Sequence, residues 1–508
     1  MSKRNRHSNY RTPRRPPASG RQPSGRLAAR DIATSADELL AFQAHFQSLL
    51  ERREQHDWFL FYMCGQLSDL ERKTSEPMVL ALLGPQVNAV RTAQHFIGHG
   101  AWPSGPFLEQ AQDLVADWLG EPDGVVIVDG SGFPKQGQQS VGVAWQYCGH
   151  LGKLANCQEG ILVVYASRRG YAFVDERLYV PPPIVTIGGW FGADYQARWQ
   201  RCGMPEGLTF RTEPQLGLDM ITNLVKGAVL PFRWVTCDEK YGENPAFLDG
   251  LAALGKWYLA EVAADTRVWL HRPPIEPPGP SLLGPARTQP RVKRTAPRPQ
   301  EMRELSTSLP PSLWQRRVIK EGSKGPLVAE FAWLRVTPIR EGLPGPRCWA
   351  VFRRTLGAQP EVKFYLSNAP TTCPRQEFVR VSGLRWPVET AIEEARGEVG
   401  MDHYETRTWA GWHHHMTLSI LAHLFLIRLR LVFQKKSGPD HRPSSPAHCT
   451  CYRRRAGNFT RYLGHCALSP ASKPRRLLLA SQTDTVTAKP LPLQAAQRQS
   501  FVVITDLS

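Results

Sequence analysis

Apolar residues recur at intervals of three and four in the early part of the chain. The segment Ser35-Ala36-Asp37-Glu38 has the form of a capping box, and the stripe that follows it consists of Leu39, Phe42, Phe46, Leu49 and Leu50. Similar sequence runs through Trp58–Cys64 and Pro77–Phe96. This spacing is typical of helices whose apolar faces pack in a core. We therefore expect a helical N-terminal domain over residues 31–120.

From residue 124 the apolar positions form short runs that are typical of strands. Val125–Val128 is the first run, and it leads into Asp129-Gly130-Ser131-Gly132. Further strands are expected at Ser140–Tyr147, Gly160–Ser167, Tyr171–Val180, Phe232–Cys237 and Trp257–Val262, and helices at Glu213–Val229 and Ala246–Leu254. Strands followed by alternating helices and strands predict a mixed α/β domain, a sheet flanked by helices, whose first part spans residues 121–265.

Residues 266–370 are expected to interrupt this domain. His271–Pro299 contains nine prolines and six Lys or Arg residues, which favours a linker or an extended loop. The β-rich runs that follow are Gln315–Lys320, Leu327–Val336, Cys348–Arg354 and Val362–Leu366. They predict a small sheet inserted into the α/β unit.

The α/β pattern resumes over residues 371–434. A helix is expected to start at Pro387, and Met416–Phe433 predicts an apolar helix. Because His423, Arg428 and Arg430 interrupt this second helix, we expect it to be buried in the protein and not to span a membrane.

Composition adds a strongly basic balance to this picture. The 508 residues include 63 Lys and Arg against 45 Asp and Glu, a formal charge of +18, and 42% hydrophobic residues, which excludes wholesale disorder. Residues 1–30 hold nine of the basic residues and no acid, as expected for a disordered basic arm that follows phosphates or for a solvated tail. Residues 435–508 form a second basic segment, rich in Pro and Ser. The excess charge favours a polyanionic partner such as nucleic acid.

The cysteines and the first residues bear on the compartment. Ten cysteines are scattered without a framework spacing, which favours reduced thiols. The chain begins with basic and polar residues and lacks the apolar segment of a secretory signal. We therefore expect a cytoplasmic protein.

Three acids stand out by their context. Asp129 ends the first strand, Asp238 ends a later strand, and Glu389 lies in the first turn of the helix that starts at Pro387. An acid at the carboxyl end of a buried strand points into the crevice where α/β sheets bind ligands. Three converging carboxylates repel one another unless a cation neutralises them, and oxygen ligands favour Mg²⁺ or Mn²⁺. Two such ions, about 3.5–4 Å apart, serve phosphodiester displacement.

Each acid also has a purely structural interpretation. Asp-Gly-Ser-Gly is a common turn, Asp238 can be a solvated strand end, and an acid in the first turn of a helix complements the helix dipole. The three acids are therefore more specific as a set than singly.

Several motifs together make the set specific. They are Val128-Asp129-Gly130-Ser131-Gly132-Phe133, Ser140-Val141-Gly142-Val143, Asn156-Cys157-Gln158, Val235-Thr236-Cys237-Asp238-Glu239-Lys240-Tyr241-Gly242 and Arg385-Trp386-Pro387-Val388-Glu389. With these motifs the sequence resembles the DDE transposases of bacterial insertion sequences, which have an RNase H-like catalytic core. It is most similar to the subgroup with a β-strand insertion before the catalytic Glu. The resemblance extends from about Leu67 to about Leu429.

The resemblance implies a catalytic and metal-binding triad of Asp129, Asp238 and Glu389 that holds two Mg²⁺ or Mn²⁺ ions. It implies metal-dependent cleavage of double-stranded DNA at transposon ends and transfer of the freed 3′-hydroxyl into target DNA. A homodimer would act on paired inverted-repeat ends, in the bacterial cytoplasm and associated with the nucleoid. Under this interpretation the helical N-terminal domain is a candidate for binding the DNA ends.

The family's helix signature is Tyr, two residues, Arg, three residues, Glu, six residues, Lys. Arg385 and Glu389 occupy the Arg and Glu positions, whereas Arg396 replaces the Lys and Ser382 replaces the Tyr. Arg385 and Arg396 are then expected to bind phosphate. Ser382 offers a hydroxyl to a phosphate but no ring to stack on a base. The alternative is an ordinary charged helix face with pairs at i,i+3 and i,i+4.

Three further residues are candidates for contacting DNA. Trp386 lies beside the catalytic Glu, and Lys135 and Lys240 follow the two aspartates closely. Solvated lysines are the alternative for the last two. Glu393 and Glu394 are alternatives to Glu389 as the third ligand.

Other motifs favour different chemistry only weakly. His413-His414-His415 lies on a helix, where three successive side chains cannot face one ion, so core or surface histidines are expected. Cys449, Cys451, His465 and Cys466 match no common zinc module. No phosphate-binding Gly-rich loop is present in the sequence. A nuclease without strand transfer and a catalytically silent, transposase-derived DNA-binding protein remain alternative functions.

Overall fold

The computed structural model describes residues 29–182, 190–191, 195–281, 284–322 and 325–437. The predicted basic arm and basic tail lie almost wholly outside these residues. The possible zinc group of Cys449, Cys451, His465 and Cys466 lies outside them as well.

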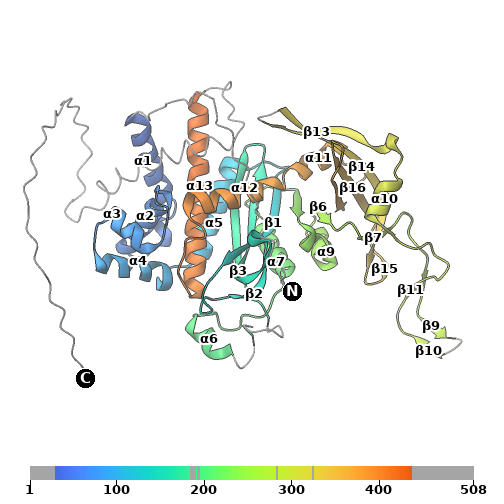
Figure 1. Ribbon diagram of the computed structural model, residues 1–508, viewed down its shortest axis with the longest axis horizontal. Coiled ribbons are helices and arrows are strands. Elements are labelled where there is room, and N and C mark those ends of the chain that lie inside the picture. Colours follow the sequence, from blue (N-terminus) through green and yellow to red (C-terminus); the bar gives the residue numbers. More distant parts are fainter. Residues whose placement is uncertain (1–28, 183–189, 192–194, 282–283, 323–324, 438–508) are drawn as a thin grey trace, which may run out of the picture. The chain divides into compact units, whose positions relative to one another are not determined.

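Five strands form the centre of a large sheet (Figure 1). They are β1 (Val125–Pro134), β3 (Lys153–Ser167), β4 (Gly170–Tyr179), β5 (Trp234–Cys237) and β6 (Trp257–Val262), and β2 (Ala144–Cys148) pairs with β3 as well. Their order is β4, β3, β1, β5, β6, and among these five β3 alone runs antiparallel to β1. This is the topology of an RNase H-like core. The predicted fold class, a mixed α/β sheet flanked by helices, is confirmed.

Strand β1 continues beyond the point where the sequence predicts its end. Asp129 pairs with Leu162 of β3, and pairing continues to Pro134. The turn interpretation of Asp129-Gly130-Ser131-Gly132 is therefore wrong, because β3 supplies backbone partners along the whole of β1. On its other side β1 pairs with β5 only up to Val128, which lies opposite Cys237.

The inserted strands extend the same sheet. β17 (Val362–Ser367) pairs antiparallel with β6, so the strands of the predicted insertion belong to the main sheet. Without β17 the edge of β6 would carry unpaired backbone groups, and the insertion satisfies them. Outward from β17 lie β16 (Cys348–Thr355), β14 (Gly325–Arg340), β7 (Arg267–Trp269) and β12 (Gln300–Glu301), with β13 (Gln315–Gly322) and β15 (Leu343–Pro344) also paired with β14.

The predicted proline-rich linker contains short strands. Its two small antiparallel pairs are β8 (Ile275–Glu276) with β11 (Arg291–Val292), and β9 (Gly279–Ser281) with β10 (Gly284–Arg287). Helix α10 (Met302–Ser308) and a short 3₁₀ turn (Pro311–Leu313) connect this region to β13.

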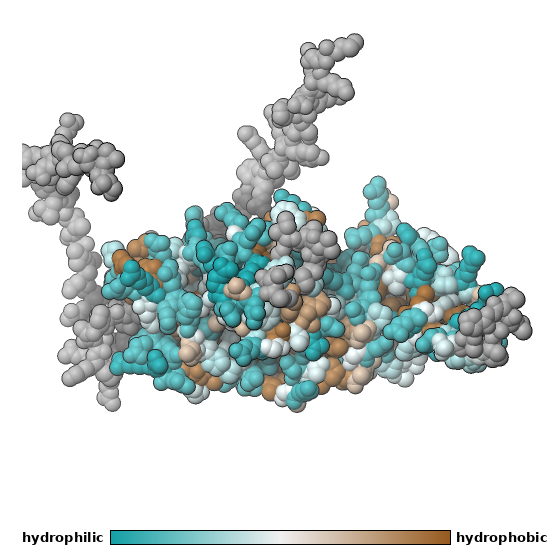
Figure 2. All heavy atoms as spheres, turned by 90° about the horizontal axis from the view of Figure 1, so that it is seen from below, coloured by the Kyte–Doolittle hydropathy of each residue, from teal (hydrophilic) through white to brown (hydrophobic). Residues whose placement is uncertain are grey.

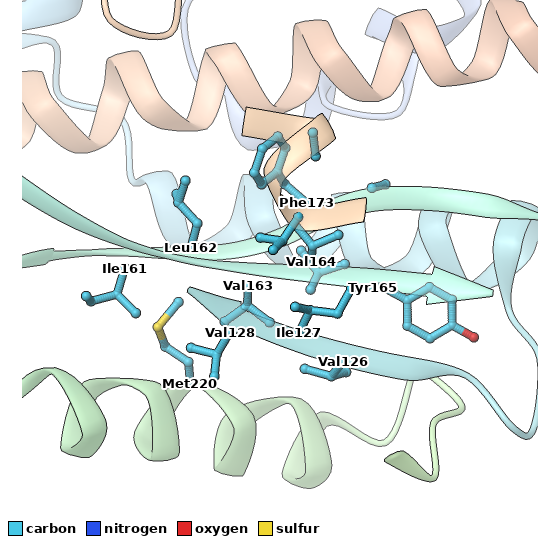
Figure 3. Packing of buried hydrophobic residues seen from close by; sticks show 14 of the residues in the cluster. Val126, Ile127, Val128, Ile161, Leu162, Val163, Val164, Tyr165, Phe173 and Met220 are labelled. Atoms are coloured by element: carbon cyan, nitrogen blue, oxygen red, sulfur yellow. The ribbon is translucent and has the colours of Figure 1, made fainter. Parts of the chain in front are cut away.

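Side chains of the central strands alternate between two helical layers. Val126 and Val128 face α7 (Glu213–Gly227), where Met220 meets them, whereas Leu162 and Phe173 lie on the opposite side of the sheet (Figure 3). The second layer contains α12 (Trp386–Glu394) and α13 (Trp409–Ser437), which pack against β3 and β4. The first layer also contains α8 (Glu239–Gly242) and α9 (Pro245–Ala253), and the short helix α6 (Gln196–Arg201) precedes α7.

Gly217 allows α7 to approach the sheet closely. A Cβ at this position would lie 3.1 Å from Cγ2 of Val128 and 3.0 Å from the ring of Tyr241. These are tighter than ordinary contacts, so a larger residue would push the helix away from β1.

The N-terminal helices share a core with the sheet. They are α1 (Ala29–Ala44), α2 (Arg53–Leu67), α3 (Ser75–Leu82), α4 (Val87–His99) and α5 (Ser104–Leu119), with a 3₁₀ turn at Gln47–Leu49. One cluster of buried apolar side chains runs from Leu39 to Leu429. The expected helices are present, but Ser35 lies inside α1, so the predicted capping box is wrong. The division of the chain into domains stays a prediction.

Helix α13 lies at the centre of this shared core. It packs against α2, α4, α5 and β4. Its segment Trp409–Phe433 is long and apolar enough to cross a membrane by length and composition alone, but 67% of its most apolar stretch is buried within the protein. On the face seen in Figure 2, hydrophobic residues form scattered groups among hydrophilic ones.

Three successive histidines on α13 are buried, as the core interpretation predicts. His413 bonds with Glu176, His414 with the carbonyls of Ile97 and Trp102, and His415 with the Tyr62 hydroxyl and the Met401 carbonyl. Because each ring has its own partners, the three side chains do not converge on one ion.

All the cysteines in the described part of the chain are free and buried. They are Cys64, Cys148, Cys157, Cys202, Cys237, Cys348 and Cys373. This agrees with the expectation of reduced thiols for these seven residues.

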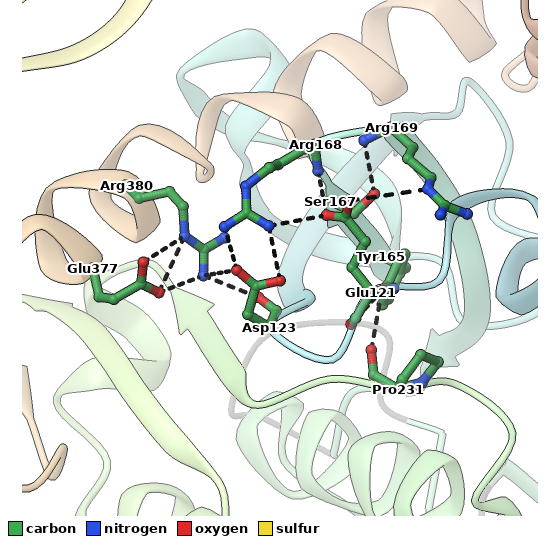
Figure 4. A network of polar contacts seen from close by, with 9 residues as sticks. All are labelled: Glu121, Asp123, Tyr165, Ser167, Arg168, Arg169, Pro231, Glu377 and Arg380. Atoms are coloured by element: carbon green, nitrogen blue, oxygen red, sulfur yellow. Dashed lines mark hydrogen bonds and ion pairs between the residues drawn. The ribbon is translucent and has the colours of Figure 1, made fainter. Parts of the chain in front are cut away.

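A polar network ties helix α11 (Arg375–Gly383) to the start of β1 (Figure 4). Arg380 donates to the carbonyl of Asp123 at 2.9 Å and pairs with Glu377, while Arg168 donates to both carboxylate oxygens of Asp123 at 3.1 and 2.6 Å. Burial raises the pKa of Asp123, but the hydrogen bond from Arg168 and the charge of Arg380 bring it below its usual value. Since α11 leads into α12, the network helps to position the segment that carries Glu389.

The Arg380→Ala variant should therefore be less stable. We expect the free energy of unfolding to fall by about 1–3 kcal/mol at neutral pH, because a charged donor is lost from partly buried acceptors. The lowered pKa of Asp123 stabilises the fold above the unfolded-state pKa of about 3.9 and ceases to do so as the pH falls through the folded-state value. Urea denaturation should show a smaller deficit in acid, and Arg91→Ala, on the exposed face of α4, should unfold like the parent protein.

Candidate active site

Two aspartates lie at adjacent positions on paired parallel strands. β1 and β5 pair from Val125 and Trp234 up to Val128 and Cys237. Asp129 and Asp238 directly follow these last paired residues of β1 and β5. Because neighbouring strands lie about 4.8 Å apart, the register places the two carboxylates at the same level of the sheet.

Local hydrogen bonds orient both aspartates. Oδ1 of Asp129 accepts from the amide of Gly130 at 2.8 Å. Asp238 caps the N-terminus of α8, where its Oδ1 accepts from the amide of Tyr241 at 3.4 Å. The second oxygen of each carboxylate has no such local backbone bond.

The charged form of Asp129 is strongly disfavoured. Burial, with the charges of Asp238 and Glu389, raises its pKa to about 7, although the charge of Arg385 and the hydrogen bond from Gly130 lower it. The pKa of Asp238 is raised too, chiefly by burial, with Arg385 again opposing. Because the charges of Asp238 and Glu389 both raise the pKa of Asp129, all three acids lie close enough to interact electrostatically.

Glu389 reaches this neighbourhood from helix α12. The helix begins with Trp386 and Pro387, and it packs against β1, β3 and β4. The side chain of Glu389 is 49% exposed, and its Oε1 lies 3.6 Å from Nη2 of Arg385. Glu389 is thus the most accessible of the three acids.

Arg385 lies among four carboxylates. Its Nη1 donates to Oε2 of Glu261 at 2.7 Å. Burial lowers the pKa of Arg385, but the charges of Glu261, Asp129, Glu389 and Asp238 together raise it above its usual value. The guanidinium therefore neutralises part of the negative charge of the site.

The donor set has the chemistry that a divalent cation requires. Carboxylate oxygens are hard ligands of the kind that Mg²⁺ and Mn²⁺ prefer, and a bound cation would relieve the repulsion that raises the pKa of Asp129. Among the described residues, however, no group of three or more His, Cys, Asp or Glu side chains is close enough to hold a metal ion. The residues fit the ion chemically, and the side chains must close in to coordinate it.

Arg396 is turned toward strand β1. It lies in a π-helical segment, Ala395–Val399, that directly follows α12. Its Nη2 donates to Oγ of Ser131 at 2.9 Å and to the carbonyl of Gly132 at 2.7 Å. The guanidinium is thereby bound to β1, and burial lowers its pKa.

Lys135 and Lys240 are each held by neighbours. Nζ of Lys135 donates to the carbonyl of Tyr404 at 3.2 Å and lies 3.3 Å from the centre of that ring, and burial lowers its pKa to about 7. Lys240 donates to both carboxylate oxygens of Glu213 at 2.5 Å. Their predicted contacts with DNA stay predictions.

Ser382 and Trp386 have opposite environments. Ser382 is buried, and its hydroxyl donates to the carbonyl of Val379 at 2.8 Å, so it is not free to meet a phosphate in this structure. Trp386 is 61% exposed, and Nζ of Lys320 lies 5.4 Å from the centre of its ring. Of the two, Trp386 is the side chain that a ligand can reach.

The two alternative acids on α12 do not take the place of Glu389. Glu394 bonds with His423 and Arg430 of α13, both at 3.2 Å. Burial raises its pKa, but the bond from His423 and the charges of His423 and Arg430 lower it to about 2. Glu393 is exposed.

A cavity of about 750 Å³ adjoins Glu389 on the side of the insertion. Four cationic side chains line it, together with Trp386 and Glu261; the cations are Lys320, Arg353, Lys363 and Arg385. Lys363 pairs with Glu261, whereas no ion pair involves Lys320 or Arg353 within the described part of the chain. The cavity wall therefore carries more positive than negative charge, because Lys320 and Arg353 add to cations that Glu261 and Glu389 already pair.

Sequence reasoning missed Glu261 and the cations contributed by the insertion. Glu261 is an acid within the buried run Tyr258–Val262, and this unusual placement is the signal that could have identified it. Lys320, Arg353 and Lys363 had no such signal, because they are basic residues among many on ordinary strands. Only the pairing of β17 with β6 brings them to the acids.

The comparison with protein families agrees with this geometry. The family described as DDE superfamily endonuclease matches residues 45–326, which is more than half of the chain. The chain belongs to this superfamily. Asp129 and Asp238 lie inside the matched range, and Glu389 lies beyond it. Endonucleases of the DDE superfamily generally act on DNA with divalent metal ions.

One curated relative extends the match toward the C-terminus. A protein described as a probable transposase for insertion sequence element IS701, from Microchaete diplosiphon, is 23% identical over 356 residues. The alignment covers 70% of this chain and 78% of the relative. With the family match, it confirms the expected insertion-sequence DDE transposase.

Two solved structures show a weak likeness. One is a piggyBac transposase synaptic complex with hairpin DNA, at 10% identity and a TM-score of 0.37, covering 86% of this chain and 80% of that chain. The other is the NurA nuclease from Sulfolobus solfataricus, at 13% identity and a TM-score of 0.24, covering 59% of this chain and 86% of that chain. Neither score adds to the argument from topology and family.

Removing the charge of Asp129 should stabilise the metal-free transposase at neutral pH. A carboxyl whose pKa rises from 3.8 to about 7 on folding costs stability as the pH increases through that window, because the unfolded chain has already released its proton. In EDTA, Asp129→Asn should therefore melt at a higher temperature than the parent at pH 7.5. The difference should shrink as the pH falls toward 4. An unchanged difference across this range in thermal melts would contradict the site's electrostatics.

Proposed function

We propose that this transposase cuts DNA at the ends of its element and joins the freed 3′-hydroxyl to target DNA, with Asp129, Asp238 and Glu389 as the metal-binding triad. The proposal rests chiefly on the parallel register that sets Asp129 beside Asp238, with the charge of Glu389 acting on Asp129. The sequence motifs point to the same three residues, and the range matched by the family includes Asp129 and Asp238.

Two divalent cations, Mg²⁺ or Mn²⁺, would polarise the phosphodiester and lower the pKa of the attacking water or hydroxyl. Asp129 and Asp238 are held in place by β1, β5 and the N-terminus of α8. Glu389, on a half-exposed helix face, can approach them when cations reduce the repulsion. Arg396 fixes the end of α12 to β1 through Ser131 and Gly132, which keeps Glu389 in register with the strand.

The cavity beside Glu389 provides a route for the DNA strand. Lys320 and Arg353 supply cations without an acidic partner among the described residues, and Trp386 supplies an exposed aromatic face. Basic side chains that follow phosphates, together with an aromatic surface, suit a strand whose bases are partly unpaired. Arg385 joins this cationic wall to the acids.

A homodimer is the expected functional form. Each chain contains one such acid site, whereas an element has two ends that must be joined to one target. The charge of +18 favours assembly on DNA over association of free chains, because like charges repel. Light scattering of the transposase with and without end DNA should give two chains per pair of ends.

Substitution of Asp238 should separate chemistry from binding. Asp238→Asn keeps the helix cap, since Asn caps as well as Asp, but removes a charged metal ligand. We expect cleavage of end DNA in Mg²⁺ to fall by at least about a thousandfold, whereas the gel-shift affinity for the same DNA stays near that of the parent. Asp113→Asn, on the exposed face of α5, is the matched control. Full cleavage by a folded Asp238→Asn protein would exclude this ligand assignment.

A pre-cut end distinguishes a transposase reaction from simple nuclease activity. Incubated with the protein, Mg²⁺ and a plasmid, a pre-cut end with a free 3′-hydroxyl should become covalently joined to the plasmid. Plasmid nicks without joined products would favour a nuclease without strand transfer.

The cavity cations should contribute to DNA affinity through phosphate contacts. Lys320→Ala and Arg353→Ala should each weaken binding uniformly across sequences and reduce the slope of log affinity against log salt by about one. Lys226→Ala, an exposed lysine at the end of α7 away from this cavity, should leave the slope unchanged. Salt titrations of fluorescently labelled end DNA measure this. Parental slopes for both cavity variants would mean that DNA follows another path.

A further inference from the structure

Arg385 occupies the place of a cation among the acids. Four carboxylates surround it, and they come from four different elements: Asp129 of β1, Asp238 after β5, Glu261 of β6 and Glu389 of α12. In the protein without metal, this guanidinium therefore supplies the positive charge that the acids need.

The guanidinium of Arg385 is bound more closely to Glu261 than to Glu389. Nη1 donates to Oε2 of Glu261 at 2.7 Å, a full charge-assisted hydrogen bond, whereas Nη2 lies 3.6 Å from Oε1 of Glu389, beyond hydrogen-bond distance. Nε of Arg385 is buried and has no hydrogen-bond partner. Glu261 is thus the anchor of the guanidinium, and Glu389 is a looser neighbour.

Glu261 is built to keep this role. Its side chain is buried, and each oxygen has its own cation, since Nζ of Lys363 donates to Oε1 at 3.0 Å. The two cationic partners hold this buried carboxylate in position. It lies on β6, the strand next to β5, so it is held by the sheet itself.

Arg385 and a divalent cation compete for the same negative field. Two positive charges in a partly buried site repel each other strongly, because the local dielectric is low. In the present arrangement, in which Arg385 lies among the acids, the described residues form no group of three acids that could hold an ion. A divalent cation can therefore bind the triad only if Arg385 moves away from the three acids. Arg385 can do so and still keep its hydrogen bond to Glu261.

We propose that Arg385 is an internal counter-cation of the acid site, and that Glu261 is a positioning residue that holds Arg385 at the edge of the site so that divalent cations can enter. The inference rests on the proposed metal-binding triad. Entry of the cations would release Glu389 from Arg385 toward the aspartates. Cation entry would also leave free N–H groups of Arg385 facing the cavity, where they can donate hydrogen bonds to a phosphate.

The two side chains should then act on metal affinity in opposite directions. In Arg385→Gln the competitor is gone, so Mn²⁺ should bind more tightly, by about tenfold for the loss of one close charge. In Glu261→Gln the guanidinium is released toward Glu389 and the aspartates, so Mn²⁺ should bind more weakly by a similar factor. The double variant should bind like Arg385→Gln, because Glu261 acts through Arg385.

Calorimetric titration of the full chain with MnCl₂, without DNA, measures this directly. Asp238→Asn is included to test the triad itself. If it binds Mn²⁺ like the parent, the proposed metal site and this inference both fail. If Asp238→Asn loses Mn²⁺ binding but Arg385→Gln binds Mn²⁺ no more tightly than the parent, the triad stands and the counter-cation role of Arg385 is overturned. Additive effects in the double variant would likewise overturn the positioning role of Glu261.

Folding of the variants does not decide the outcome. Arg385 lies at the cavity wall, and in Arg385→Gln the buried Glu261 keeps Lys363 as its partner, so this variant is expected to fold. Arg385→Lys keeps the charge and should restore affinity toward the parental value. A tighter Mn²⁺ site in Arg385→Lys than in the parent would contradict a role that depends on charge.

Discussion

The parallel pairing of β1 with β5 is the constraint on which the site depends. It stops at Val128 and Cys237, and the next residue of each strand is an aspartate. Two carboxylates at one level of a sheet repel each other, and burial strengthens that repulsion. The fold therefore holds an unfavourable arrangement that a cation makes favourable, and the surrounding core provides the rigidity that this requires.

That core joins parts of the chain that are far apart in sequence. Helix α13 contacts the N-terminal helices on one side and β4 on the other, so the helices over residues 29–119 support the sheet that carries Asp129. The polar network around Asp123 and Arg380 connects the start of β1 to α11. The helix that carries Glu389 is thus fixed at its beginning by α11 and at its end by Arg396.

The insertion is part of the main sheet and also contributes residues to the cavity beside the acids. Because β17 pairs with β6, the inserted strands continue the sheet and carry Lys363 and Arg353 to the edge of the acid site. The same strand pairing places Lys363 against Glu261. One backbone interaction therefore creates both the cationic wall of the cavity and the anchor of Arg385.

The sequence alone determined the α/β class and the order of the main elements, because hydrophobic periodicity and short motifs are local properties of the chain. The proposed triad also came from short motifs, and it stays a prediction. Most strand and helix positions followed from the sequence, from β3 to α13. Predictions from the sequence failed where a strand or a side chain depends on a partner that is distant in the sequence. β1 continues past Asp129 because β3 pairs with it, and the insertion joins the main sheet because the edge of β6 is available. The burial of Ser382 and the attachment of Lys240 to Glu213 were also outside the reach of the sequence. Glu261 was missed for the same reason: its importance comes from Arg385 and Lys363, which lie more than a hundred residues away and meet it only in the folded chain.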